Sequence, residues 1–246
     1  MALLMDGPPS TIEELTSHDS QLLNVASGEG IDVTKKLALA QQVTALEVEG
    51  LLRNRGHHHV KLSQVVVTPW LRMWHTYAAL ELVYTDAYNS QLNDRYAGKR
   101  DQFRALASWA YDKLVNAGIA VTNRPVPQAA QPDVASMAGS LLDNTYYVTM
   151  AWVNAGGEEG SSAVSSAITT TSSAFLVTPP AAPAEATGWN VYSGTTPGTM
   201  VRQNGAPIPT DQPWQQTAVP AAAGPKPGDG QAPSRVLALP RILQRG

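Results

Sequence analysis

The sequence predicts an α+β chain of more than one domain, with an N-terminal helical bundle, a small β-sandwich and an extended C-terminal arm. Between Thr68 and Gly118, apolar residues recur three and four positions apart, which is typical of amphipathic helices. From Thr145 onwards, short apolar runs are separated by Gly and Pro, which indicates strands. From Pro220 the chain is rich in Pro, Gly and Ala, which indicates an unfolded segment.

These shifts in composition divide the chain into four parts. We expect a helical domain over 1–122 and a Pro-rich linker or edge segment over 123–144. A β-sandwich over 145–219 and a flexible docking arm over 220–246 complete the prediction.

The first predicted helix runs from about Ile12 to Val25. Either Ser10 with Glu13 or Thr11 with Glu14 supplies a capping box at its start.

Asp32 or Thr34 caps the second predicted helix, and Gly56 ends it. Its inner stripe contains Leu37, Ala40, Thr44, Val48 and Leu51, with Leu52 adjacent.

Two long helices follow, the first beginning with the N-cap Thr68 and with Pro69 in the first helical position. It extends to about Leu92 and is roughly 35 Å long, at 1.5 Å per residue. The second ends at Gly118. With short joints, the four helices suit a bundle. The first long helix has more aromatic surface than a single-copy bundle should hide, so we expect self-association through Trp70, Trp74, Tyr77 and Tyr84.

The β-sandwich prediction rests on strand-like runs and the turns between them. The runs lie at 145–153, 161–171, 175–177, 189–192, 200–203 and 214–217, and residues 156–160 form a turn. We expect Trp152 or Trp189 to anchor the sandwich core. Exposed Trp side chains, with Trp214 among the candidates, would instead form a sugar-binding face.

Charged residues make up only 15% of the chain, and the formal net charge is −3. Either the surface is covered in an assembly or the loops are polar and uncharged. The net charge gives no sign of nucleic-acid binding. The chain has no Cys, no stretch of eighteen apolar residues and no signal-peptide pattern. We therefore expect a soluble product made in the cytoplasm, with no membrane contact.

Catalytic and metal-binding patterns were not found in the sequence. His57, His58 and His59 are adjacent, so they do not share a helix face, and a polar loop is the favoured interpretation. His75 lies among aromatic residues and is predicted to be a hydrogen-bonded core or interface residue. No set of residues provides an acid, a base and a nucleophile, so we expect no enzyme, no cofactor and no metal.

The end of the arm combines apolar and basic side chains, which favours docking on a partner, although a frayed terminus has the same pattern. The candidate docking residues are Arg235, Leu237, Leu239, Arg241, Ile242, Leu243 and Arg245. Pro240 interrupts any helix there, so we expect this segment to be disordered until it binds.

Three stretches resemble known families. Residues 145–161 resemble the late hairpin of fibronectin type III domains, and 186–198 resemble central strands of the same fold in a different order. The arrangement in 186–198 is similar to Ig-like modules of tailed-bacteriophage virion proteins. Residues 24–40, together with the Trp/Tyr helix pair, resemble the helical head–tail adaptor (connector) proteins beneath a phage portal.

The resemblance implies a structural protein that joins capsid to tail at the neck of the virion. It implies a homo-oligomeric ring, a dodecamer, with the portal and a tail or nozzle protein as partners. DNA would pass through the ring without sequence-specific binding. The alternatives are a tail or capsid decoration protein whose Ig-like module binds host glycans, and a virion-associated lysin, which the missing acid/base pair disfavours.

Overall fold

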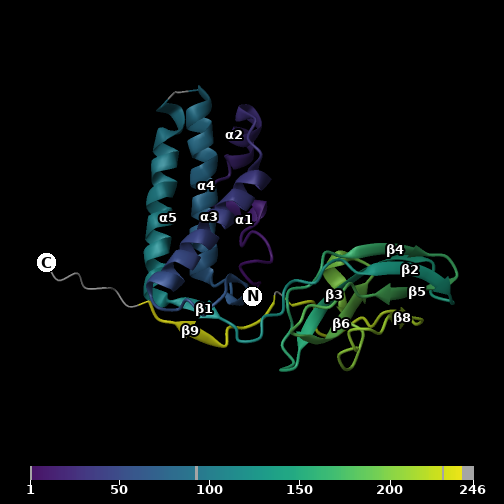
Figure 1. Cartoon of the computed structure of the whole chain (residues 1–246). Helices are drawn as coiled ribbons and strands as arrows, with labels where there is room; N and C mark the ends of the chain where they lie inside the picture. The colour runs from purple at the N-terminus through teal and green to yellow at the C-terminus, as the bar shows by residue number, and fades with distance from the viewer. Residues whose placement is uncertain (1, 92–93, 229, 240–246) are drawn as a thin grey trace. The chain divides into compact units, whose positions relative to one another are not determined.

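The computed structural model describes residues 2–91, 94–228 and 230–239, which form two compact units. The helical unit consists of Gly7–Thr122 and the described residues from Pro233 on. The β-unit consists of Asn123–Ala232 and the described residues up to Asp6. This division differs from the four predicted parts, because residues 2–6 belong to the β-unit and residues 233–239 belong to the helical unit. Mixed α and β structure is confirmed (Figure 1).

The helical unit contains more helices than predicted in its described part. They are α1 (Ile12–His18), α2 (Leu22–Glu29), α3 (Val33–Asn54), α4 (Pro69–Gln91) and α5 (Ala97–Ala117), with short 3-10 turns at Leu62–Gln64 and Asp94–Tyr96. The predicted helix over 12–25 is wrong as a single element. Asp19 ends α1, and its carboxylate accepts the N–H of Gln21, which turns the chain before α2 begins.

The predicted caps are confirmed where their hydrogen bonds are defined. Thr11 and Glu14 form the capping box of α1. The Asp32 side chain accepts the Lys35 N–H at 3.1 Å, and Thr68 Oγ1 accepts the Leu71 N–H at 3.3 Å. These bonds satisfy helix-end donors that have no partner within the helix.

A small antiparallel sheet pairs the segment that follows α5 with residues 235–237. Strand β1 (Ile119–Val121) pairs with β9 (Arg235–Leu237), with Ile119 opposite Leu237. On the other side of β1, the N–H of Val66 donates to the carbonyl of Ala120. Along the sequence, residues 123–232 of the β-unit therefore lie between β1 and β9, which pair with each other in the helical unit.

The β-unit contains two antiparallel sheets. Strands β2 (Asp133–Ala138), β5 (Ser173–Thr178) and β8 (Trp214–Gln216) form one, in the order β2-β5-β8. The other has the order β4-β3-β6-β7 and contains β3 (Asn144–Asn154), β4 (Ser166–Thr170), β6 (Ala186–Gly194) and β7 (Val201–Arg202). One buried cluster takes side chains from both sheets, including Trp152, Phe175 and Trp189.

Two segments predicted to lie outside the folded domains contain strands. Residues 133–138 of the predicted linker form β2, which is an edge strand, as the edge interpretation allowed. Within the predicted flexible arm, residues 235–237 form β9. Both segments pair with an open strand edge, which supplies backbone hydrogen bonds that composition alone does not reveal.

Candidate functional site

The predicted aromatic interface on α4 is mostly core, and the prediction is wrong for three of its four residues. Trp74, Tyr77 and Tyr84 retain only 7%, 8% and 1% exposure within a single chain. The Trp74 ring meets Tyr111 of α5 edge-on at 5.1 Å, and Tyr84 stacks on Phe103 at 5.5 Å. The Tyr77 ring lies against His18 of α1. Because α5 and α1 cover these side chains, they are not available to another copy.

Trp70 is the member of that set that keeps exposed surface. It is half-buried and meets Trp109 of α5 edge-on, with 5.6 Å between ring centroids. Trp109 is 43% exposed, and the Lys113 ammonium lies 5.8 Å from its ring centroid. The pair forms an exposed aromatic patch with a cation beside it, which we call the Trp70–Trp109 patch.

A buried carboxylate ties three helices together. Tyr84 Oη donates to Asp19 Oδ2 at 2.6 Å, and Lys99 Nζ donates to the same oxygen at 3.0 Å. Although burial favours the neutral acid, these hydrogen bonds hold the pKa of Asp19 below its ordinary value. Burial and the Asp19 carboxylate raise the pKa of Tyr84. The cluster is fully paired, which indicates a structural role.

His75 is fully buried and hydrogen-bonded, as predicted. Its Nδ1 lies 2.9 Å from Ser10 Oγ, and its Nε2 lies 3.1 Å from the carbonyl of Leu37. A carbonyl only accepts, so Nε2 carries the proton and Nδ1 accepts from the Ser10 hydroxyl. Burial lowers the pKa of His75 to about 4. The neutral ring links the start of α1, α3 and α4.

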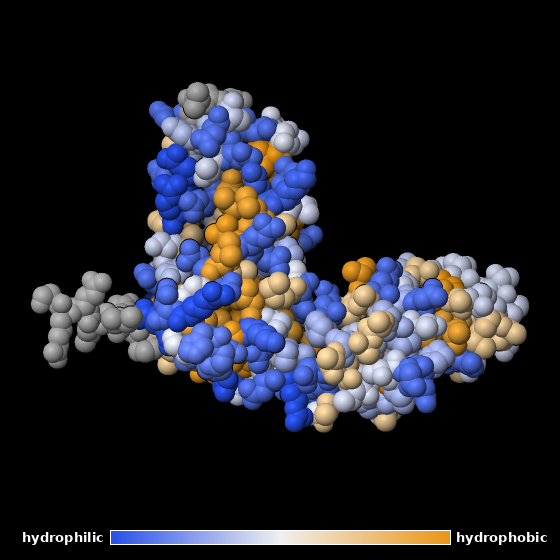
Figure 2. Space-filling view, in the orientation of Figure 1, coloured by the Kyte–Doolittle hydropathy of each residue, from blue (hydrophilic) through white to orange (hydrophobic). Residues whose placement is uncertain are grey.

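The outer face of α3 carries a row of apolar side chains exposed to solvent. Leu39, Val43 and Leu46 are 41%, 43% and 68% exposed, and their spacing of four and three places them on one line. The inner stripe of α3 lies on the opposite side and is buried as predicted at Leu37, Ala40, Thr44 and Val48. At its end the prediction is off by one residue, because Leu52 is buried and Leu51 is only partly buried. Figure 2 shows an apolar band on the face over which α3 runs. We call Leu39, Val43 and Leu46 the α3 stripe.

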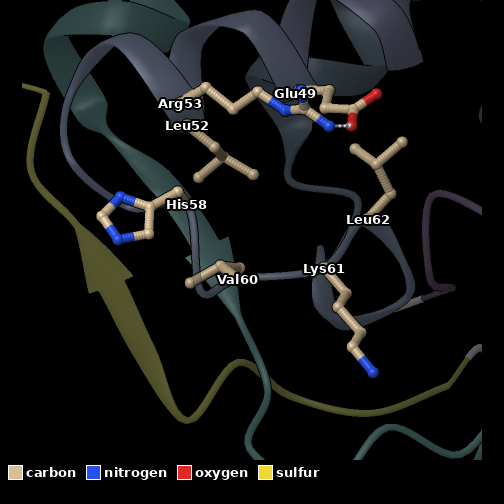
Figure 3. A pocket seen from close by; sticks show the side chains of 7 residues that line it. All are labelled: Glu49, Leu52, Arg53, His58, Val60, Lys61 and Leu62. Atoms are coloured by element: carbon tan, nitrogen blue, oxygen red, sulfur yellow. Dashed lines mark hydrogen bonds and ion pairs between the residues drawn. The ribbon is translucent and has the colours of Figure 1, made fainter.

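A cavity of about 300 Å³ lies at the C-terminal end of α3 (Figure 3). Leu52, Val60 and Leu62 supply apolar walls, and the Glu49–Arg53 ion pair lies along its rim. His58 also lines it, but among the described residues no group of three or more His, Asp or Glu could hold a metal ion. The predicted polar loop at 57–59 therefore borders this cavity through His58.

The C-terminal arm residues fall into two groups. Leu237 and Leu239 are 8% and 5% exposed and pack within the helical unit, and Arg235 is exposed. The carbonyl of Ala238 lies 3.3 Å from His57 Nε2. The prediction that the arm is disordered before binding is wrong for 235–239, because β1 offers it a pairing edge. Arg241, Ile242, Leu243 and Arg245 lie outside the described residues.

Gly118 makes the close approach of β9 possible. Its φ of +88° and ψ of 169° belong to a region that only glycine adopts readily. A Cβ at this position would lie 2.5 Å from the carbonyl oxygen of Leu237. The sequence predicted this glycine as a helix end, but not its second role.

Both candidate Trp anchors of the β-unit are confirmed as core residues. Trp152 and Trp189 are 2% and 0% exposed and lie opposite each other on β3 and β6. The indole N–H of Trp189 lies within hydrogen-bonding distance of two carbonyls, Pro209 and Gln212, each at 3.2 Å. Trp214 is half-buried against the same core.

The turn at 156–160 is confirmed, but its two carboxylates are not simply solvated. Glu158 accepts from the side chains of Asn154 and Gln231. Glu159 accepts from Asn190 and from the hydroxyl of Tyr192. Apart from Asn154, which belongs to the same hairpin, these partners are more than thirty residues away in the chain, so the turn sequence alone does not reveal them.

No helix in the described ranges is long and apolar enough to cross a membrane. The sequence matches no protein-family model, no curated protein and no solved structure.

Proposed function

We propose that this chain is a structural virion protein of a tailed bacteriophage, a head–tail adaptor whose helical unit forms a ring beneath the portal. Its partners are further copies of itself, the portal, and a tail or nozzle protein. DNA passes through the ring without sequence-specific contacts. Ring size follows from the resemblance alone, which implies twelve copies. The C-terminal residues Arg241, Ile242, Leu243 and Arg245 are the proposed contact to the portal.

The α3 stripe is the observation that carries this proposal. A row of three exposed aliphatic side chains on one helix is a typical mark of a protein–protein contact, whereas single exposed apolar residues are ordinary. A contact repeated between like subunits closes into a ring when the rotation allows it. The sequence resemblance of residues 24–40 to adaptor proteins supports the same function.

For the β-unit we propose an Ig-like, fibronectin-III-like sandwich. In the described residues, its seven strands lie in sheets of three and four, and β3 pairs with β6 as well as with its sequence neighbour β4. Pairing between strands that are not consecutive in the sequence is typical of sandwich domains. The unit would face the capsid, the tail or the outside of the particle.

Glycan binding by the β-unit would need exposed Trp side chains, and its candidate Trp residues are not exposed. Trp152 and Trp189 are buried, and Trp214 packs against the core. We therefore propose the adaptor in preference to the decoration protein.

Native mass spectrometry and negative-stain imaging of the full chain test the proposal. We expect closed rings, alone or on addition of the portal protein encoded by the same genome. A matched chain that ends at Leu239 should still form the subunit contacts but bind the portal more weakly. A full chain that stays monomeric with and without the portal would contradict the adaptor function.

A further inference from the structure

The α3 stripe and the Trp70–Trp109 patch are exposed apolar surfaces of the helical unit that differ in shape. The α3 stripe is a narrow aliphatic ridge, whereas the Trp70–Trp109 patch is a pair of flat aromatic rings at an angle of 80° to each other. An aliphatic ridge against aromatic faces is a favourable and common packing arrangement.

The two surfaces lie on different helices. The stripe lies on the outer face of α3, whereas the patch is formed by Trp70 of α4 and Trp109 of α5. Leu46 and Trp109 are both exposed within a single copy, so one copy does not bury its own stripe against its own patch.

The charges beside the two surfaces are complementary. On α3, Glu47 and Glu49 flank the stripe at Leu46, one on each side. Glu49 is paired with Arg53 of the same helix, which makes Glu47 the acidic group of this rim. On α5, Lys113 lies over the Trp109 ring. Opposite charges at the edge of an apolar contact fix its register and discriminate against wrong orientations.

We propose that the α3 stripe of one copy packs against the Trp70–Trp109 patch of the next copy, with Glu47 facing Lys113 across the rim. This inference rests on the proposed ring and names the contact that builds it. Because the two surfaces differ, the contact is head to tail. Such contacts generate rings or filaments, whereas stripe-to-stripe contact would stop at a two-fold dimer.

Single-surface variants of the full chain test the contact. Leu46→Lys places a charge on the stripe and should weaken self-association on the order of tenfold or more. Leu46 is 68% exposed, so the monomer should keep its fold. Leu23→Lys is the matched control, because Leu23 is 50% exposed on α2 outside the stripe, and it should assemble like the wild type.

A mixing experiment separates head-to-tail contact from two-fold contact. Leu46→Lys keeps an intact aromatic patch, and Trp109→Gln keeps an intact stripe. Each variant alone should be monomeric, and their mixture should form a one-to-one dimer that grows no further, as measured by native mass spectrometry. If Trp109→Gln alone associates like the wild type, the stripe does not bind the patch and the inference is overturned.

The charge pair provides a second readout that does not depend on apolar packing. Glu47→Lys and Lys113→Glu should each weaken assembly, and the double variant should recover part of the loss. No recovery in the double variant would contradict the assigned register.

Failure of this contact can be told apart from failure of the ring. A wild-type chain that stays monomeric at every concentration overturns both. Rings that persist in Leu46→Lys overturn the contact and leave the adaptor function standing. Filaments that disappear in Leu46→Lys support the contact and overturn the ring.

Discussion

Replacing His75 with Gln should remove much of the acid sensitivity of the helical unit. In the folded chain the neutral His75 ring accepts from Ser10 and donates to the Leu37 carbonyl. A Gln side chain has the same two functions, since its amide oxygen accepts and its NH₂ donates, but it does not titrate near neutral pH. The substitution therefore separates the charge of His75 from its hydrogen bonds.

The expected magnitude follows from the pKa of His75, which burial lowers from 6.5 to about 4. As pH falls below 6.5, the unfolded chain binds a proton that the folded chain does not. The unfolded state is thereby favoured, so stability is full above pH 6.5 and falls progressively towards pH 4. The loss over this window is about 3 kcal/mol. Below pH 4 both states are protonated at this site, and its contribution becomes constant.

Urea unfolding followed by circular dichroism at 222 nm, at pH 8 and near pH 4.5, measures this difference. The wild type should lose about 2 to 3 kcal/mol more than His75→Gln over this range. Carboxylates contribute to both chains alike, so they cancel in the comparison. Equal losses in the two chains would refute the argument that His75 is held neutral by burial.

Three further predictions concern the fold. Trp189→Ala should destabilise the β-unit by about 3–5 kcal/mol, because the indole ring is fully buried and its N–H is hydrogen-bonded. The melting temperature of the β-unit measures this loss, and an unchanged value would place Trp189 at the surface. Gly118→Ala should cost about 1–3 kcal/mol from backbone strain alone and should increase hydrogen exchange at 235–237; unchanged exchange would show that β9 tolerates a Cβ there. A chain that begins at Gly7 and has a short Gly/Ser turn in place of 123–232 keeps β9, so the melting temperature of the helical unit should not change. A chain from Gly7 that ends at Thr122 lacks β9, so its melting temperature should be lower. Equal melting temperatures for the two chains would mean that β9 adds no stability.

The helices and most strands could be predicted from the sequence because their signals are local. Thr68 and Pro69 begin α4 through side-chain and backbone chemistry within one turn, and Gly118 ends α5 in the same way. The turn after β3 is likewise encoded by its glycines.

The missed features depend on partners distant in the chain. Strand β9 has only three residues in a Pro/Gly-rich stretch, and it is ordered because β1 presents an edge to it. The break between α1 and α2 depends on Asp19, whose partners Tyr84 and Lys99 come from α4 and α5. The aromatic residues of α4 resemble an interface when α4 is considered alone, because their partners lie on α1 and α5 and meet them only in the fold.

Helix α3 carries a second apolar row that is present in the sequence but is not part of the predicted inner stripe. Its buried stripe and its exposed stripe lie on opposite faces, so the helix has a partner on one side and lacks one on the other within a single copy. The core of the chain accounts for Leu37 and Val48, but not for Val43 or Leu46. Leaving these aliphatic side chains in water forgoes the free energy of their burial. Burial of the α3 stripe by another copy would recover that free energy, which is why the proposed adaptor function is better tested on α3 than on the buried aromatic residues of α4.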